Sequence, residues 1–224
     1  MTKSECVDPH AFTLIFLKKE GYKMVNIYGT MIFKSRFEED LVKIFDLLTE
    51  YENKANSMNN FLLSIGYTQP EIMDNITPDD KVCYVDDEIS NIDNEYLYFR
   101  IDFESHPNFP KFLTNCIEKK YKVEVVYQYD NLDNNVFVNT DTSGLYLPHR
   151  YLVDTYISHD DEYYAVSVET LDEAVEEVCS HFASFREYSK GKYKSAVDVN
   201  KLIQEYLSED ESYSNIYEYD KEDN

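Results

Sequence analysis

Hydrophobic and polar residues alternate along several segments of the chain, and this pattern predicts β-strands. Residues 22–34 place valine, isoleucine, methionine and phenylalanine on one face of a period-2 strand. Residues 95–104 show the same alternation, and residues 122–129 predict a third strand. Shorter strands are predicted at 136–139 and 144–147, on either side of a turn rich in Asp, Thr, Ser and Gly.

A hydrophobic stripe at the spacing of an amphipathic helix recurs four times along the chain. Ser35 with Glu38, and Thr170 with Glu173, have the spacing of a capping box, which predicts where two of these helices begin. The predicted helices span residues 36–52, 109–121, 171–182 and 196–207.

This order of elements predicts an α+β fold with a ferredoxin-like, split-βαβ antiparallel sheet and helices 36–52 and 109–121 on one face. The chain is expected to divide into a core at 22–150 and an acidic strand–helix–helix extension at 151–207. Residues 54–95 are weakly patterned and are predicted to form a loop-rich insertion within the core.

Both ends of the chain need a separate interpretation. Residues 208–224 carry seven acidic residues and few aliphatic ones, which predicts a disordered tail. The apolar run at 11–18 leaves two interpretations open, because it fits either the first strand of a hairpin or a loose N-terminal arm.

Several of these segments resemble a known family. The stretch Val25-Asn26-Ile27-Tyr28-Gly29-Thr30, the strand at 98–105, and the helix and strand at 107–129 are similar to the ferredoxin-like Api92/YubB group of phage and plasmid proteins. The resemblance covers about residues 22–150. It implies an origin in a phage or another mobile element, and it brings no catalytic residues with it.

The charge of the chain limits which partners it can bind. Its 21 Lys and Arg against 44 Asp and Glu give a net charge of −23, which argues against direct contact with nucleic acid or an anionic membrane. No apolar run is long enough to span a bilayer, and the first residues lack the features of a secretory signal. The four cysteines fit no CxxC pattern, and a protein of the bacterial cytoplasm is therefore expected.

Sequence motifs for enzymatic chemistry are missing. The chain has no P-loop, GxGxxG, HExxH or GxSxG motif, and its five glycines leave little material for a phosphate-binding loop. We therefore expect no enzyme, no cofactor and no metal. A metal–carboxylate site at residues 74–87 or 159–162 is the less favoured alternative, because consecutive ligands cannot all point at one ion.

Residues 151–185 stand out because they contain nine acidic residues and no Lys or Arg. Tyrosines accompany the acids, and tyrosine offers contact area to arginine through cation–π contacts. Two explanations stay open: an acidic surface for a basic partner, or the composition of a low-GC genome. Sequence alone suggests these partner-binding residues: Asp160, Asp161, Glu162, Tyr163, Tyr164, Asp172, Glu173, Glu176 and Glu177.

The leading hypothesis is a non-enzymatic inhibitor of a basic, nucleic-acid-handling host defence protein, of the anti-CRISPR or anti-restriction type. It would act through its acidic surface. Imitation of nucleic acid, whose backbone presents a charge about every 1.7 Å, is one way in which it could do so. A general protein-interaction adaptor with incidental acidity is the alternative.

Overall fold

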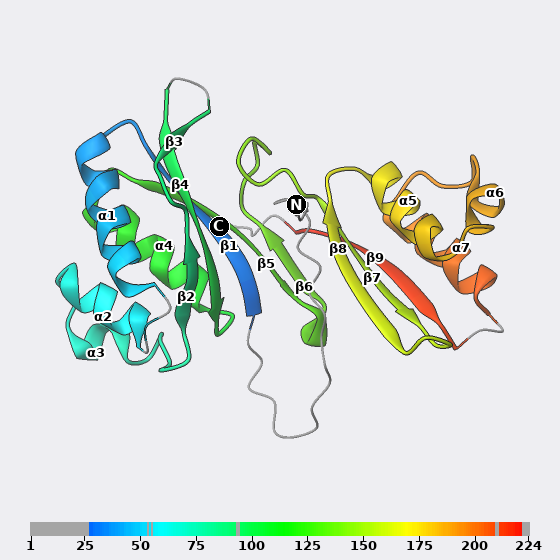
Figure 1. Ribbon diagram of the computed structural model, residues 1–224, viewed down its shortest axis with the longest axis horizontal. Coiled ribbons are helices and arrows are strands. Elements are labelled where there is room, and N and C mark those ends of the chain that lie inside the picture. Colours follow the sequence, from blue (N-terminus) through cyan, green and yellow to red (C-terminus); the bar gives the residue numbers. More distant parts are fainter. Residues whose placement is uncertain (1–26, 53, 55, 93–94, 209–210, 221–224) are drawn as a thin grey trace, which may run out of the picture. The chain divides into compact units, whose positions relative to one another are not determined.

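The computed structural model describes residues 27–220 apart from 53, 55, 93–94 and 209–210, and these residues form two compact units (Figure 1). The first unit lies within Tyr22–Leu147 and includes Asp220, and the second lies within Pro148–Tyr219. The apolar run at 11–18 and the beginning of the segment 22–34 lie outside the described residues. Each unit has its own sheet and its own hydrophobic core, so each is described by itself.

The first unit has the ferredoxin-like order of elements. Its sheet runs β2-β4-β1-β5-β6, with β3 also pairing with β4, and every pair of neighbouring strands is antiparallel. The elements β1, α1, β2, β4, α4 and β5 therefore follow a βαββαβ order, with β1 and β4 inside the sheet and β5 beside β1. This confirms the predicted α+β class and antiparallel sheet. The elements are β1 (Ile27–Ser35), α1 (Glu38–Tyr51), α2 (Ser57–Ser64), α3 (Gln69–Ile72), β2 (Lys81–Val85), β3 (Ser90–Asn91), β4 (Leu97–Ser105), α4 (Phe109–Lys120), β5 (Glu124–Asn131), a 3₁₀ turn (Leu132–Asn134) and β6 (Val136–Asn139).

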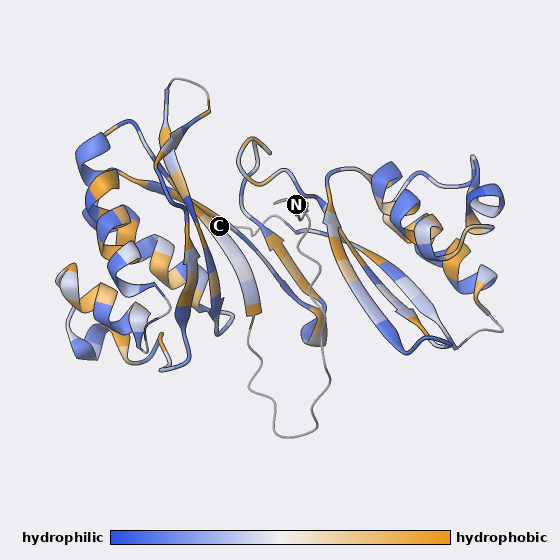
Figure 2. Cartoon of the chain, in the orientation of Figure 1, coloured by the Kyte–Doolittle hydropathy of each residue, from blue (hydrophilic) through white to orange (hydrophobic). Residues whose placement is uncertain are grey.

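Helices α1 and α4 lie on the same face of this sheet, as the helical stripes at 36–52 and 109–121 predict (Figure 1). Odd-numbered residues of the central strands point toward these helices, and the rings of Phe33 and Phe99 stack at 5.0 Å in the core. Leu41 of α1 and Leu113 of α4 are fully buried against them. Figure 2 shows hydrophobic residues alternating with hydrophilic ones along α1 and α4, as the amphipathic pattern requires.

Gly29 lies where β1 passes between β4 and β5, and there is no room for a side chain there. A Cβ at this position would lie 2.5 Å from the carbonyl oxygen of Gln128 and 2.8 Å from Cβ of Tyr129. The glycine of the Asn-Ile-Tyr-Gly-Thr segment therefore serves close packing within the sheet rather than a turn.

Three expectations for the first unit are wrong. Residues 54–95 are not a loop-rich insertion alone, because they contain β2, which pairs with β4 and completes the sheet. Ser35 does not cap α1: the helix begins at Glu38 after Phe37, and the buried Ser35 hydroxyl donates to the carbonyl of Lys122. The predicted strand at 144–147 is irregular chain instead.

The second unit is a three-stranded antiparallel sheet, ordered β8-β7-β9, with its helices on one face (Figure 1). Val153 of β7 and Ile216 of β9 are buried against residues of all three helices. The capping box of Thr170 and Glu173 is present at the start of α5. The elements are β7 (Tyr151–Ile157), β8 (Glu162–Val168), α5 (Leu171–His181), α6 (Phe185–Ser189), α7 (Ala196–Tyr206) and β9 (Tyr213–Glu218).

The expectation of a disordered tail at 208–224 is wrong for much of that segment. Residues 213–218 form β9, which pairs along its whole length with β7, and Ile216 is only 2% exposed. The extension predicted at 151–207 therefore has three strands rather than one, and its last strand comes from the supposed tail. Within the described residues, no helix combines the length and the apolar composition needed to cross a membrane.

Candidate functional site

The β7–β8 hairpin holds the first group of predicted site residues. Its turn brings Asp161 into the left-handed region of backbone conformation, with φ of 54°, and the Tyr156 hydroxyl donates to Asp161 Oδ1 at 3.1 Å. Nε2 of His159 lies 3.0 Å from Asp160 Oδ2. All three acidic residues, Asp160, Asp161 and Glu162, are exposed. The hairpin therefore presents its carboxylates to solvent.

The two tyrosines that follow the turn point to opposite faces of the sheet, as neighbours in a strand must. The Tyr163 ring packs on the ring of Tyr156 at 4.5 Å, on the face away from the helices. The Tyr164 ring contacts the imidazole of His181 on α5, with ring centroids 4.3 Å apart. Its hydroxyl donates to Glu162, and this hydrogen bond raises the pKa of Tyr164.

The four acidic residues of α5 each have a partner within the second unit. Glu176 forms an ion pair with Arg186, and Asp172 accepts a hydrogen bond from the Tyr193 hydroxyl at 3.1 Å. Glu177 Oε1 lies 3.4 Å from Nε2 of His181. Glu173 belongs to the capping box, where its carboxylate accepts the backbone N–H of Thr170 at 3.2 Å. Glu176 thus faces a guanidinium, whereas Asp172 and Glu173 are held by hydrogen bonds, which orient a carboxylate without removing its charge.

The structure brings only some of the predicted residues together. Glu162, Tyr164, His181 and Glu177 form a continuous series of contacts from β8 to α5, whereas Asp172 and Glu176 turn to the other edge of the helix. Glu173 lies one helical turn before Glu177 on the same edge. We call the following residues the acidic surface: Asp160, Asp161, Glu162, Tyr164, Glu173, Glu177 and His181.

The metal–carboxylate alternative finds no support in the positions of its residues. In the hairpin, Asp160, Asp161 and Glu162 each bind a different partner and do not converge. In the other loop, Asp80 is buried and accepts backbone N–H groups of Thr77 at 2.6 Å and His106 at 2.7 Å. Among the residues that the structure describes, no group of three or more His, Cys, Asp and Glu could hold a metal ion.

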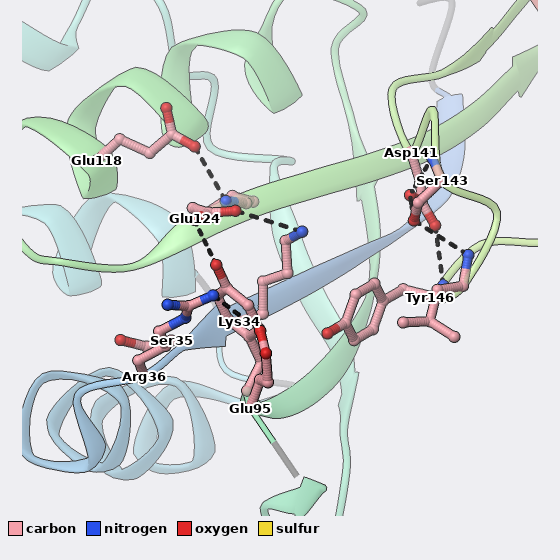
Figure 3. Close-up of polar contacts among 12 residues, drawn as sticks. Lys34, Ser35, Arg36, Glu95, Glu118, Glu124, Asp141, Ser143 and Tyr146 are labelled. Atoms are coloured by element: carbon pink, nitrogen blue, oxygen red, sulfur yellow. Dashed lines mark hydrogen bonds and ion pairs between the residues drawn. The ribbon is translucent and has the colours of Figure 1, made fainter. Parts of the chain in front are cut away.

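Sequence reasoning missed a pocket in the first unit, where β1 ends beside the start of β5. It measures about 370 Å³ and is lined by cations, aromatic rings and the carboxylates of Glu118 and Glu124. Figure 3 shows polar contacts of several of its residues, among them Lys34, Arg36 and Glu124. Arg36 lies over the Tyr96 ring at 4.7 Å, and Lys122 lies over the Phe37 ring at 4.3 Å. The segment Lys34-Ser35-Arg36, with two cations in a very acidic chain, is the signal that could have revealed it.

Two of the cations of this pocket already have acidic partners. Lys34 Nζ lies 3.3 Å from Glu124 Oε2, and Arg36 lies 2.8 Å from Glu95 Oε2. Lys34 also lies 4.9 Å from the centroid of the Tyr146 ring. The charges of Lys34 and Arg36 are therefore balanced, so an anionic ligand would have to displace a carboxylate to reach either of them.

Asp141 holds the loop that places the Tyr146 ring beside Lys34 (Figure 3). Its carboxylate accepts the backbone N–H groups of Tyr146 and Leu147 at 2.9 Å each and that of Ser143 at 3.1 Å. Burial alone would raise the pKa of Asp141, but these hydrogen bonds and the Ser143 hydroxyl lower it below its usual value. The loop is therefore a structural turn rather than a reactive site.

Comparison with known proteins adds little to this picture. No family model matches the chain, and no curated protein matches it. One solved structure, titled "Crystal structure of putative glycine cleavage system transcriptional repressor", is similar over 71% of this chain and 94% of its own. The TM-score is 0.26 and the sequence identity is 8%, and we draw nothing about function from it.

Proposed function

We propose that this chain is a non-enzymatic protein that binds and inhibits a basic, nucleic-acid-handling protein of a bacterial host. The acidic surface is the contact, in the manner of an anti-CRISPR or anti-restriction inhibitor that imitates nucleic acid. Under this proposal the protein acts in the cytoplasm of that host and comes from a phage or another mobile element, in line with the resemblance of residues 22–150.

One observation carries the proposal. The contact between Tyr164 and His181 joins the acidic hairpin to the acidic edge of α5, and residues 151–185 contain no Lys or Arg to interrupt them. A partner rich in Lys and Arg meets carboxylates and a tyrosine ring on the same surface. Complementary charge of this kind accelerates encounter and selects the partner, and its effect falls as salt rises.

The test is affinity capture from a bacterial lysate, performed with the full chain at low and at high salt. We expect the captured protein to bind DNA or RNA, to be retained less at high salt, and to lose its nucleic acid when this chain is added. A captured protein without nucleic-acid binding, or one whose nucleic acid is not displaced, would contradict the proposal.

A pair of variants with equal charge locates the contact. Asp160→Asn with Glu162→Gln removes two charges from the acidic surface, and Asp87→Asn with Glu88→Gln removes two from an exposed loop of the first unit. We expect the first pair to slow association with the captured protein by about tenfold and the second pair by about twofold or less. Equal effects of the two pairs would show that only net charge matters.

The general adaptor is the second candidate, and one observation favours it. Three of the four acidic residues of α5 are hydrogen-bonded or ion-paired within their own unit, and Glu177 lies beside His181, so these acids also have a structural explanation. An adaptor would bind a partner through apolar and hydrogen-bonded contacts. Its association rate would then change little between low and high salt.

A further inference from the structure

Along the outer edge of β8, the backbone groups of three residues have no hydrogen-bond partner among the residues that the structure describes. Successive residues of a strand direct their backbone hydrogen bonds to opposite sides. Just before β7, the carbonyl of Arg150 accepts the amide of Tyr219, which follows β9, so the even-numbered residues of β7 hydrogen-bond to β9 and the odd-numbered ones to β8. On β8 this leaves the backbone N–H and C=O groups of Tyr163, Ala165 and Ser167 pointing outward. No hydrogen bond to these backbone groups exists within the described residues.

The other outer edges of the two sheets are covered. On β2, the amides of Val82 and Val85 donate to the side chains of Ser57 and Glu52. On β6, Asp220 exchanges backbone hydrogen bonds with the residues on either side of Val138.

On β9, the central residue Ile216 is paired with the side chain of Asn200. Proteins protect sheet edges in such ways because an open edge pairs with other chains. Among the described edges, β8 is the long one that lacks this protection, since β3 has only two residues.

We infer that the edge of β8 binds an extended, Lys- or Arg-bearing segment of the partner, which adds to the sheet as a further strand. This inference rests on the proposed function and names the form of the partner's contact. Backbone hydrogen bonds supply affinity in such strand addition, and side chains on alternate positions supply specificity.

The charge around the strand determines which peptide fits. Asp160, Asp161 and Glu162 lie at the beginning of β8, and Glu169 follows its end, all of them exposed. An added strand with basic residues at its ends therefore meets carboxylates at both ends of β8, whereas an acidic strand is repelled.

The side chains of β8 favour a segment whose side chains can pack on aromatic rings on both faces of the sheet. Tyr163 and Tyr156 form an aromatic surface on one side of the strand, with ring centroids 4.5 Å apart. Tyr164 and His181 form another on the other side, at 4.3 Å. Both tyrosines of β8 are half-buried, so each ring has area left for a neighbouring strand.

The probe is a short synthetic peptide that alternates Lys and Val, compared with the same peptide carrying Glu for Lys and with one N-methylated at alternate residues. Binding to the full chain is measured by isotope-edited NMR and by fluorescence titration. We expect the Lys peptide to bind and to shift the amide signals of Tyr163, Ala165 and Ser167 more than those of Tyr164 and Val166. The Glu peptide and the N-methylated peptide are expected to bind more weakly by about tenfold or more.

Ala165→Pro tests the edge from the protein side. The Ala165 N–H points outward, so proline removes a donor from the free edge without removing a bond between β7 and β8. The matched control is Ala165→Ser, which keeps the N–H. We expect the proline variant to lose about tenfold in peptide affinity and the serine variant about twofold or less.

The remaining outcomes decide between this inference and its rivals. Equal binding of the normal and N-methylated peptides overturns the inference. Because this comparison uses the unaltered protein, it remains valid even if the proline variant does not fold. A dimer that Ala165→Pro abolishes, without any peptide binding, overturns it in favour of a second copy of the chain.

The captured partner separates the failure of this inference from the failure of the proposed function. If its binding responds to Asp160→Asn with Glu162→Gln but not to Ala165→Pro, the proposed function stands and the strand contact is wrong. If its binding responds to Ala165→Pro but not to the loss of the two charges, the strand contact stands and the acidic surface is not what the partner recognises.

Discussion

The carboxamide of Asn200 pairs with both backbone polar groups of Ile216. Its Nδ2 donates to the Ile216 carbonyl at 2.8 Å, and its Oδ1 accepts the Ile216 N–H at 2.8 Å. One side chain of α7 thus takes the place of a neighbouring strand on β9. Both polar groups of a central strand residue are satisfied without a fourth strand.

The first prediction concerns this pair. Asn200→Ala leaves the N–H and C=O of Ile216 without their partner, so we expect the free energy of unfolding of the second unit to fall by about 1–3 kcal/mol. Urea unfolding followed by circular dichroism measures it. Gln204→Ala, on an exposed position of the same helix, is the control and should change little. A loss for Asn200→Ala no larger than the control's would show that water replaces the carboxamide at no cost.

The second prediction concerns β9 itself. Ile216 is buried in the core of the second unit, so Ile216→Ala should lower the free energy of unfolding by about 2–5 kcal/mol, and Ile216→Val by about 0.5–1.5 kcal/mol. A chain ending at Leu207 lacks β9 and should lose the near-ultraviolet signal of the tyrosines in this unit. If that shortened chain melts at the same temperature as the full chain, β9 does not stabilise the unit.

The third prediction concerns Gly29 in the first unit. Gly29→Ala would place a methyl group 2.5 Å from the Gln128 carbonyl oxygen and 2.6 Å from the ring of Phe103, where the backbone cannot move away easily. We expect a loss of about 1–3 kcal/mol in the free energy of unfolding, from overpacking. Thr30→Ser keeps the hydroxyl that donates to Asp102 at 2.8 Å and serves as the control. Equal stability of the two variants would mean that β1 and β5 can separate at no cost.

The helices and strands that the sequence predicted are those whose hydrophobic pattern is visible within the segment itself. The helices α1, α4 and α5 and the strands β1 and β4 carry long, regular stripes, and the capping box of Thr170 and Glu173 marks a helix start within a few residues. β2 was missed because it is short and its pairing with β4 is irregular between Val82 and Tyr84.

The strands and contacts that were missed depend on distant partners. β9 has one buried aliphatic residue, Ile216, and it is held by pairing with β7 and by Asn200, which no local pattern shows. The same holds for the acids of α5. Glu176 lies beside Arg186 ten residues away, and Asp172 lies beside Tyr193 twenty-one residues away, so these partners became visible only in the fold.

The last prediction concerns the pH dependence of stability and rests on Asp154 in the middle of β7. Burial raises the pKa of Asp154 to about 6, well above its value in an unfolded chain. The native state therefore favours the protonated carboxyl. The stability that this group contributes is fully present below about pH 4 and is lost as the pH rises through about 6.

Asp154→Asn imitates the protonated carboxyl at every pH. Because the carboxyl is partly exposed, we expect a gain of about 1–2 kcal/mol over the natural chain at pH 8 and almost none at pH 4. Asp198 provides a control of opposite sign, since hydrogen bonds from the Lys194 backbone and the Ser195 side chain lower its pKa. Asp198→Asn should destabilise the protein at neutral pH, and its effect should shrink as the pH falls. Thermal unfolding across this pH range measures the stability of both variants. If Asp154→Asn changes the stability equally at pH 4 and pH 8, titration of the Asp154 carboxyl is not the cause of the change.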